Sequence, residues 1–369
     1  MTAAGGNTRV GIIGTGVISG TYLDHLEVLP GVEVVAVADI DLERATEVAS
    51  KRGNLRAMRS EDLLTDPDVD VVLNLTIPAA HAPVALAALE AGKHVYGEKP
   101  LAVRRTEAEP LLAAAAARGL RIGCAPDTVL GTGIQTARAA LDRGDIGVPT
   151  AATASFVTPG HERWHPAPEF YYQDGGGPLL DMGPYYLTAL VTLLGPVARV
   201  TARAGSAHAE RTIHTGPRAG TTFGVDIPTH LTGVVEHTSG ALSTVLMSFD
   251  IWASRMPRIE IYGTQGTLAV PDPNNFDGEV ELWSPQAGEW RALDVAGGYA
   301  GAGRGVGLAD MARAIRTGEP HRASGSLAFH VLDVMESLLE AAERDQPVQV
   351  LSTVERPAAV PLGASPDQA

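Results

Sequence analysis

Lys99 is the residue of this chain whose type and setting most clearly suggest chemistry. It lies between Glu98 and Pro100, directly after the apolar segment HVYG at positions 94–97. An ammonium group there could donate a hydrogen bond to a hydroxyl oxygen and help to move its proton. Because open α/β sheets bind ligands at the carboxyl ends of their strands, we expect a catalytic lysine rather than an ordinary surface lysine.

A glycine-rich turn near the N-terminus predicts a dinucleotide site. The apolar segment RVGII at positions 9–13 runs into Gly14, Gly16 and Ser19, and an amphipathic stretch follows. Gly14 permits a tight turn, Gly16 lets the backbone approach phosphate, and a small residue at position 19 allows close helix packing. A pyrophosphate would then lie at a helix N-terminus. The residues predicted to contact it are Gly14, Thr15, Gly16, Val17 and Ile18.

An acidic residue follows at a distance suited to a ribose. Asp39 ends the second apolar segment, VEVVAVAD, about 25 residues after Gly14. A carboxylate there accepts hydrogen bonds from both ribose hydroxyls and repels a 2′-phosphate, so we expect NAD in preference to NADP. The glycine pattern alone also fits an ordinary turn, but the strand before it, the helix after it and Asp39 favour a dinucleotide.

Composition excludes several classes of partner. The chain has 369 residues, enough for two domains, and a formal net charge of -15. That charge argues against nucleic acid and anionic membranes as partners, because they require clustered Lys and Arg. Cys124 is the single cysteine, which predicts a reducing, cytoplasmic location without a disulfide framework. The segment MTAAGGNTR does not resemble a secretory signal, and no apolar run approaches the ~20 residues of a membrane span.

Strands that alternate with helices must position the Lys99 segment and the glycine turn. Between residue 9 and about residue 123, apolar segments of strand length alternate with helical patterns such as HAPVALAALEAG at positions 81–92. This alternation predicts an α/β domain with a doubly wound parallel sheet, a Rossmann fold, over residues 1–125.

The pattern changes after Cys124. A helical segment at positions 133–147 precedes long segments that alternate apolar and polar residues, among them THLTGVVEHTSG at 229–240. We predict an α+β domain with a large, open, mostly antiparallel sheet over residues 126–345, completed by two helices. Residues 346–369 are rich in Pro, Ser and Ala and are expected to pack across the domains or to extend into solvent.

Four features together are similar to one known family. They are the glycine turn, Asp39, GKHVYGEKP at 92–100 and GGGPLLDMGPYYLTALVTLLG at 175–195. Over nearly its whole length the chain resembles the Gfo/Idh/MocA oxidoreductases. The resemblance implies NAD- or NADP-dependent oxidation or reduction of sugars, inositols and other polyhydroxy compounds. It also implies that Lys99 lies in the active site, where Glu98 orients or partly neutralises it.

The second catalytic motif departs from the usual pattern of the family. Asp-x-Gly-x-His is common, whereas this chain has Asp181 with Tyr185 at the histidine position. The resemblance implies that Tyr185 takes the proton role. Because a phenol titrates near ~10, Tyr185 needs Lys99 to stabilise its anion, or it mainly donates. Asp181, four residues earlier on nearly the same helical face, would contact the substrate.

Asp181 is also suited to a structural role. If Pro184 is tolerated only in a first helical turn, Asp181 would be the N-cap of a helix that runs to Leu194. Both interpretations stay open, whereas Tyr186 points elsewhere and is expected in the core.

Residues 76–81 match the family's Thr-Pro-x-x-x-His segment, except that Ile77 replaces the proline. The resemblance places Thr76 and Pro78 along the cofactor groove, mainly through backbone groups. His81 is expected beside the cofactor as a capping or packing residue rather than a catalytic one. Glu98 and Lys99 complete the predicted cofactor contacts.

Two parts of the sequence are predicted to contact the substrate and to select it. Asp127, just after the last Rossmann strand, could bond a substrate hydroxyl. The aromatic segment at 161–177 supplies Trp164, His165 and Tyr172 as platforms for a sugar ring, although a lid or an oligomer contact fits it equally well. His230, His237 and His321 lie far apart in the sequence without ligand spacing, so no metal site is expected.

The expected protein is thus an NAD-dependent dehydrogenase of a secondary alcohol in a sugar, sugar derivative or cyclitol. Two alternatives share the same residues. One is a glycosidase-like enzyme in which tightly bound NAD oxidises the sugar only transiently. The other is a non-catalytic sensor of a nucleotide or sugar, which the presence of Lys99 disfavours. Relatives commonly pair subunits through the open sheet, so the resemblance implies a homodimer or homotetramer.

Overall fold

The computed structural model describes residues 6–53 and 55–368, which form two compact units. The first unit contains the described residues up to Gly131, Gly298–Phe329 and those from Pro357 onward. The second contains Thr132–Gly297 and His330–Arg356. The division predicted at residues 125 and 345 differs from this one, because the chain returns from the second unit to the first.

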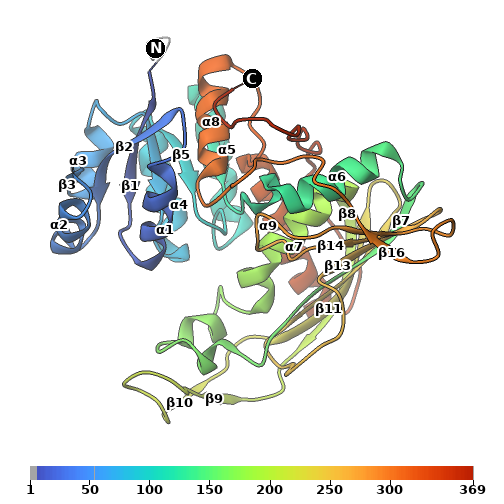
Figure 1. Cartoon of the computed structure of the whole chain (residues 1–369). Coiled ribbons are helices and arrows are strands. Elements are labelled where there is room, and N and C mark those ends of the chain that lie inside the picture. Colours follow the sequence, from blue (N-terminus) through green and yellow to red (C-terminus); the bar gives the residue numbers. More distant parts are fainter. Residues whose placement is uncertain (1–5, 54, 369) are drawn as a thin grey trace. The chain divides into compact units, whose positions relative to one another are not determined.

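Within the described residues, the first unit is built on a six-stranded sheet of order β3-β2-β1-β4-β5-β6 (Figure 1). Every pairing is parallel. β1 is buried at nearly every position, as expected of a central parallel strand covered on both faces. The strands are β1 Thr8–Ile13, β2 Val32–Ala38, β3 Arg56–Met58, β4 Val71–Asn74, β5 His94–Gly97 and β6 Ile122–Cys124. The predicted Rossmann sheet is confirmed.

Helices connect these strands. Right-handed crossovers place the helices that follow β1 and β2 on one face of the sheet and those that follow β4 and β5 on the other. The helices of this unit are α1 Val17–Leu26, α2 Leu42–Ser50, α3 Ser60–Thr65, α4 Pro78–Glu90, α5 Arg105–Arg118, the short 3₁₀ helix η1 Thr128–Leu130 and α8 Val306–Thr317.

Helix α8 was predicted in the C-terminal domain, but it belongs to the first unit and packs beside β6. Its N-terminus is fixed by Asp127, whose Oδ2 accepts hydrogen bonds from the amides of Gly305 (2.9 Å) and Gly307 (3.1 Å). A Cβ at Gly307 would lie 2.3 Å from the Tyr96 hydroxyl, so glycine permits this close approach. These are tertiary contacts, which a helical pattern in the sequence does not reveal.

The described residues of the C-terminal tail belong to both units. β17, Val348–Gln349, adds an antiparallel strand to the edge of the second unit's sheet. In the first unit, the Gly298 amide donates to the Val360 carbonyl (2.9 Å), and Val360 is buried.

The second unit is built on a nine-stranded sheet of order β16-β15-β14-β13-β7-β12-β11-β8-β17 in the described residues. β7 and β12 are parallel and the other neighbours are antiparallel. Alternating burial along β11 shows that one face is covered and the other open. The strands are β7 Pro149–Val157, β8 Val197–Gly205, β11 His230–His237, β12 Leu242–Ser248, β13 Ile259–Gly263, β14 Thr267–Val270, β15 Glu281–Trp283, β16 Trp290–Ala292 and β17. This confirms the predicted open, mostly antiparallel sheet.

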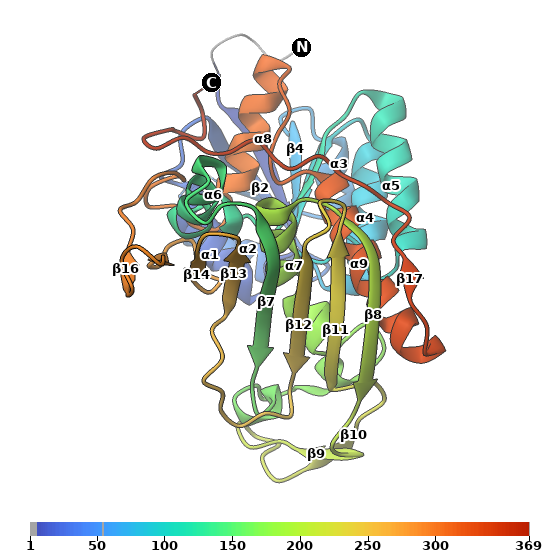
Figure 2. The ribbon, with the colours of Figure 1, turned by 90° about the vertical axis from the view of Figure 1, so that its right-hand side faces the viewer.

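Helices cover one face of this sheet, and Figure 2 shows α7 and α9 behind β7, β12, β11 and β8. α7 is apolar and buried along almost all of its length, as a helix at the centre of a core should be. A small hairpin extends beyond the sheet. The remaining elements are α6 Thr132–Arg143, η2 His161–Arg163, η3 Glu169–Tyr172, α7 Pro178–Leu194, β9 Glu210–Thr212, β10 Thr222–Gly224 and α9 Gly325–Arg344, which belongs to this unit from His330 onward.

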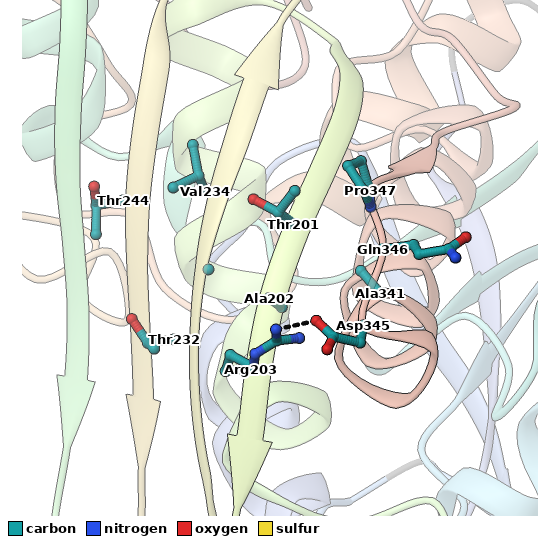
Figure 3. A pocket seen from close by; sticks show the side chains of 11 residues that line it. Thr201, Ala202, Arg203, Thr232, Val234, Thr244, Ala341, Asp345, Gln346 and Pro347 are labelled. Carbon is teal, nitrogen blue, oxygen red and sulfur yellow. Dashed lines mark ion pairs between the residues drawn. The ribbon is translucent and has the colours of Figure 1, made fainter.

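The open face carries a shallow pocket of about 370 Å³ (Figure 3). Threonines from β8, β11 and β12 line it, and Arg203 forms an ion pair with Asp345 at its edge. The catalytic and cofactor residues predicted from the sequence are not among its lining residues. No helix within the described residues is both long and apolar enough to span a bilayer.

Candidate active site

The turn between β1 and α1 has the backbone that a dinucleotide fingerprint requires. Gly14 has φ of 102°, and a Cβ at this position would lie 2.7 Å from the Leu75 carbonyl group. Gly16 is the N-cap of α1, and no atom lies within 4 Å of the position of a Cβ there. The Ser19 hydroxyl donates to the Gly16 carbonyl (2.7 Å). The N-terminal amides of α1 are therefore suited to an anion.

Asp39 is held in place by hydrogen bonds. Its Oδ2 accepts from the backbone amide (2.8 Å) and hydroxyl (2.9 Å) of Thr15, and its Oδ1 accepts from the Asp41 amide (3.0 Å). Arg44 of α2 donates to both oxygens (2.5 and 3.2 Å). Burial raises the pKa of this carboxyl, but these donors outweigh burial and bring the pKa well below its usual range. Asp39 is therefore a fixed anion.

The loop that follows β4 is organised by Asn74. Its Oδ1 accepts from the amide (3.2 Å) and hydroxyl (2.7 Å) of Thr76, and its Nδ2 donates to the His81 carbonyl (3.0 Å). Pro78 begins α4. The His81 ring is buried between the carbonyls of Thr76 (3.0 Å) and Pro100 (2.6 Å). His81 thus links two loops, and a direct cofactor contact by its ring stays a prediction.

The Glu98–Lys99 segment follows β5. Glu98 Oε1 accepts from the buried Tyr22 hydroxyl (2.8 Å), and Oε2 accepts from the backbone amide of Lys99 (3.0 Å). These contacts tie the Glu98 carboxylate to the backbone amide of Lys99, so the orienting role predicted for Glu98 has a physical basis through the main chain. Neutralisation of the ammonium by Glu98 stays a prediction.

The first unit fits a bound dinucleotide. Three apolar side chains are exposed just beyond the ends of parallel strands, namely Val17, Ile40 and Ile77, with exposed fractions of 101%, 97% and 71%. Soluble proteins seldom expose such side chains together without a ligand or partner to cover them. The open amides at Gly16 and the fixed anion Asp39 lie at the same strand ends. These residues would hold the pyrophosphate, the ribose and an adenine ring.

Asp127 has a different environment from the one predicted. It is completely buried, and its Oδ2 accepts the two amides at the N-terminus of α8. Burial raises its pKa, an effect that the nearby Arg304 and those amides oppose. Asp127 therefore caps a helix, and its burial argues against contact with a substrate hydroxyl.

Helix α7 begins earlier than predicted. Gly177, with φ of 94°, is its N-cap, and the Asp181 amide already donates to the Gly177 carbonyl (3.0 Å). Asp181 is therefore not the N-cap, and Pro184 lies inside the helix. The N-cap interpretation is therefore wrong: Gly177 takes the cap position with a positive φ that glycine adopts without strain, and Pro178 is the proline that suits the first turn. Asp181 and Tyr185 lie one turn apart, as predicted, and Tyr186 is buried in the core.

The side chain of Asp181 contacts a residue that sequence analysis missed. His161 Nε2 lies 2.9 Å from Asp181 Oδ2, and His161 Nδ1 accepts from the indole N–H of Trp164 (3.2 Å). The ring is buried and packs against Phe249, with centroids 4.4 Å apart. The sequence did contain a signal for this contact: Tyr185 replaces the histidine of the Asp-x-Gly-x-His motif, which suggests that another histidine could lie near Asp181.

A buried ionic network fixes the segment that carries His161. Arg211 of β9 donates to Glu162 Oε1 (3.0 Å) and forms an ion pair with Asp250. The Tyr172 hydroxyl donates to Glu162 and accepts from the His161 amide (3.0 Å). Tyr172 is completely buried, so its contacts are structural and argue against the predicted substrate contact.

Trp164 and His165 lie at the accessible end of this segment. Trp164 is 57% exposed, and the His165 ring lies 5.4 Å from the Trp164 ring and 5.4 Å from that of Phe170. An exposed aromatic group on a fixed loop suits a sugar ring, and this role stays a prediction for both residues. Within the described residues, no cluster of three or more His, Cys, Asp or Glu side chains is arranged to hold a metal ion.

The fold and these two sets of residues define an oxidoreductase with a dinucleotide-binding unit and a second, open-sheet unit. Residues 8–125 match the family described as oxidoreductases with an NAD-binding Rossmann fold, and residues 134–269 match the GFO/IDH/MocA C-terminal domain. The chain belongs to the Gfo/Idh/MocA oxidoreductase family, as its motifs predicted.

Known relatives agree with this assignment. The trans-1,2-dihydrobenzene-1,2-diol dehydrogenase of Bos taurus is 31% identical over 280 residues, which are 75% of this chain and 76% of that protein. Inositol 2-dehydrogenase 3 of Saccharopolyspora erythraea is 38% identical over 151 residues, 39% of this chain and 43% of that protein. An NAD-binding oxidoreductase from Klebsiella pneumoniae superposes with a TM-score of 0.81 at 25% identity, covering 94% of this chain and 99% of that structure.

Two buried tyrosines in the first unit make a matched test of the Glu98 contact. Tyr22→Phe removes the hydroxyl that donates to Glu98, and we expect it to lower the free energy of unfolding by about 1–2 kcal/mol. Tyr96→Phe removes a buried hydroxyl that has no hydrogen-bond partner within the described residues, so we expect a change below about 0.5 kcal/mol or a small gain. Urea unfolding at pH 7 measures both, and equal losses would contradict the assignment.

The lowered pKa of Asp39 predicts a pH-dependent contribution to stability. A carboxyl whose pKa is lower in the folded state stabilises the fold above its unfolded pKa of ~4, and this stabilisation is lost as the pH falls through the folded value. Asp39→Asn should therefore cost about 1–3 kcal/mol at pH 7, with the gap to wild type narrowing below about pH 4. Asp41→Asn, which keeps a helix cap, is the control, and a pH-independent gap for Asp39→Asn would refute the prediction.

Proposed function

We propose that this protein is an NAD-dependent dehydrogenase that oxidises or reduces a secondary alcohol or ketone of a sugar, a sugar derivative or a cyclitol. The observation that carries the proposal is Lys99 at the end of β5, in the unit whose strand ends also present Gly14, Gly16 and Asp39. The relatives named above are dehydrogenases of a cyclic diol and of inositol, which supports a ring hydroxyl as the reacting group.

Each residue has a part in this reaction. NAD, when bound, supplies the hydride acceptor. The amides at the start of α1 and the Asp39 carboxylate hold the cofactor through its pyrophosphate and ribose. Lys99 donates a hydrogen bond to the reacting oxygen, and Tyr185 exchanges a proton with that same oxygen, with the Lys99 ammonium as an electrostatic aid to the tyrosine anion. Asp181 accepts a hydrogen bond from a substrate hydroxyl, while Trp164 and His165 supply aromatic faces.

Location and assembly belong to the same proposal. A single cysteine is typical of a reducing compartment, so we place the protein in the cytoplasm. Val234 and Leu242 are 40% and 48% exposed on the open sheet face, and burial of such side chains would favour a homodimer or homotetramer.

A panel of monosaccharides and cyclitols tests the reaction class. The purified protein is mixed with NAD or NADP in parallel, and reduced cofactor is followed by absorbance. We expect net NADH formation with at least one ring polyol, and a preference for NAD because Asp39 repels a 2′-phosphate. Substrate cleavage without net NADH would point to the glycosidase-like cycle instead. Binding of sugar and NAD without any conversion would point to a sensor.

Lys99→Ala tests the assignment of the reacting group. Loss of a group that moves a proton should lower kcat by about 10²- to 10⁴-fold, with the Kd for NAD changed less than about threefold. Lys51→Ala, at a lysine whose side chain is 68% exposed in the same unit, is the control and should leave both values unchanged. Retained turnover in Lys99→Ala would exclude the catalytic role.

A further inference from the structure

The contact between Asp181 and His161 has a defined protonation pattern. An indole N–H can only donate, so the bond from Trp164 requires that His161 Nδ1 carries no proton. In that tautomer the proton resides on Nε2, which lies 2.9 Å from Asp181 Oδ2 and donates to it. One tautomer of a neutral imidazole therefore satisfies both contacts.

The imidazole is also fixed by its surroundings. Its ring packs edge-on against Tyr171, with centroids 4.5 Å apart, and at a tilt of 48° against Phe249, with centroids 4.4 Å apart. The His161 backbone amide donates to the Tyr172 hydroxyl, which the buried Glu162–Arg211 pair holds in turn. A donor held by packing and by a buried network loses little entropy when it makes its hydrogen bond, which is the property of a preorganised support.

We propose that His161 is a positioning residue of the active site, which holds the Asp181 carboxylate as a neutral Nε2–H donor whose tautomer Trp164 selects. The inference rests on the proposed function, in which Asp181 contacts the substrate. His161 lies outside the Asp-x-Gly-x-His motif, so this role is not part of that motif. Because His161 belongs to the aromatic segment at 161–177, the orientation of the Asp181 carboxylate depends on that segment. A shift of the aromatic segment at 161–177 would therefore change how Asp181 binds a substrate hydroxyl.

Three substitutions separate the two hydrogen bonds of the ring. His161→Gln can place an amide N–H near the position of Nε2, which keeps the donor to Asp181. His161→Asn can place a carbonyl oxygen near the position of Nδ1, which keeps the acceptor for Trp164 and removes the donor to Asp181. His161→Phe retains a ring against Phe249 and removes both hydrogen bonds.

We expect kcat/KM on the polyol found with wild type to fall about 10- to 100-fold in His161→Phe and His161→Asn, the usual scale for loss of a supporting residue, and to stay within about threefold in His161→Gln. In an Asp181→Ala background, which has no side-chain acceptor at position 181, His161→Phe should cost less than about threefold, because its route to the substrate is already lost. Equal activity of the Gln and Asn variants, or full additivity with Asp181→Ala, would overturn the proposal.

A second measurement does not depend on turnover. In ¹⁵N-histidine-labelled protein at pH 7, the ring signals that disappear in His161→Phe belong to His161. They should show a protonated Nε2 and an unprotonated Nδ1, and a protonated Nδ1 would overturn the assignment. Because this experiment needs no substrate, it fails or succeeds separately from the proposed reaction, whose own failure is absence of conversion in wild type.

Discussion

The parallel pairing of β1 with β4 and of β4 with β5 is the interaction on which the cofactor side of this protein depends. Ile13 pairs with Asn74, and Asn74 pairs with Gly97, so the three strands end at one level of the sheet. The residues that follow them, Gly14 and Glu98 among them, therefore reach the same edge. Asn74 reinforces this arrangement, because its carbonyl accepts from the Glu98 amide (2.9 Å).

Hydrogen bonds hold three of the carboxylates that the sequence predicted as site residues. Asp39 is held by four donor groups, Glu98 by Tyr22, and Asp181 by His161. Each support is a hydrogen bond to a carboxylate, and charge-assisted bonds of this kind are the stronger class in proteins. The buried pair of Glu162 and Arg211 contributes in another way, because it fixes the segment on which His161 stands rather than a reacting group.

Most of the fold could be predicted from the sequence, because its evidence is local. Apolar strands that alternate with helices specify a parallel sheet. After Cys124, segments in which apolar and polar residues alternate specify a sheet with one covered face and one exposed face. The division predicted at residues 125 and 345 differs from the two compact units, because α8 packs beside β6, where Asp127 holds its N-terminal amides. Asp127 and Tyr172 were chosen as substrate contacts for their residue types, but both are completely buried. Whether a side chain is exposed depends on segments that are distant in the sequence and pack against it, so residue type alone could not predict the burial of Asp127 and Tyr172.

By itself, the sequence determined the family, the Rossmann sheet, the glycine turn with Asp39, and the placement of Asp181 one helical turn before Tyr185. These follow from spacing along one strand, turn or helix, where covalent geometry leaves few arrangements. The tertiary structure alone decided that Gly177 starts α7, that Asp127 caps α8, and that His161 reaches Asp181. Each of these depends on tertiary packing or on a backbone angle, neither of which a periodic pattern specifies.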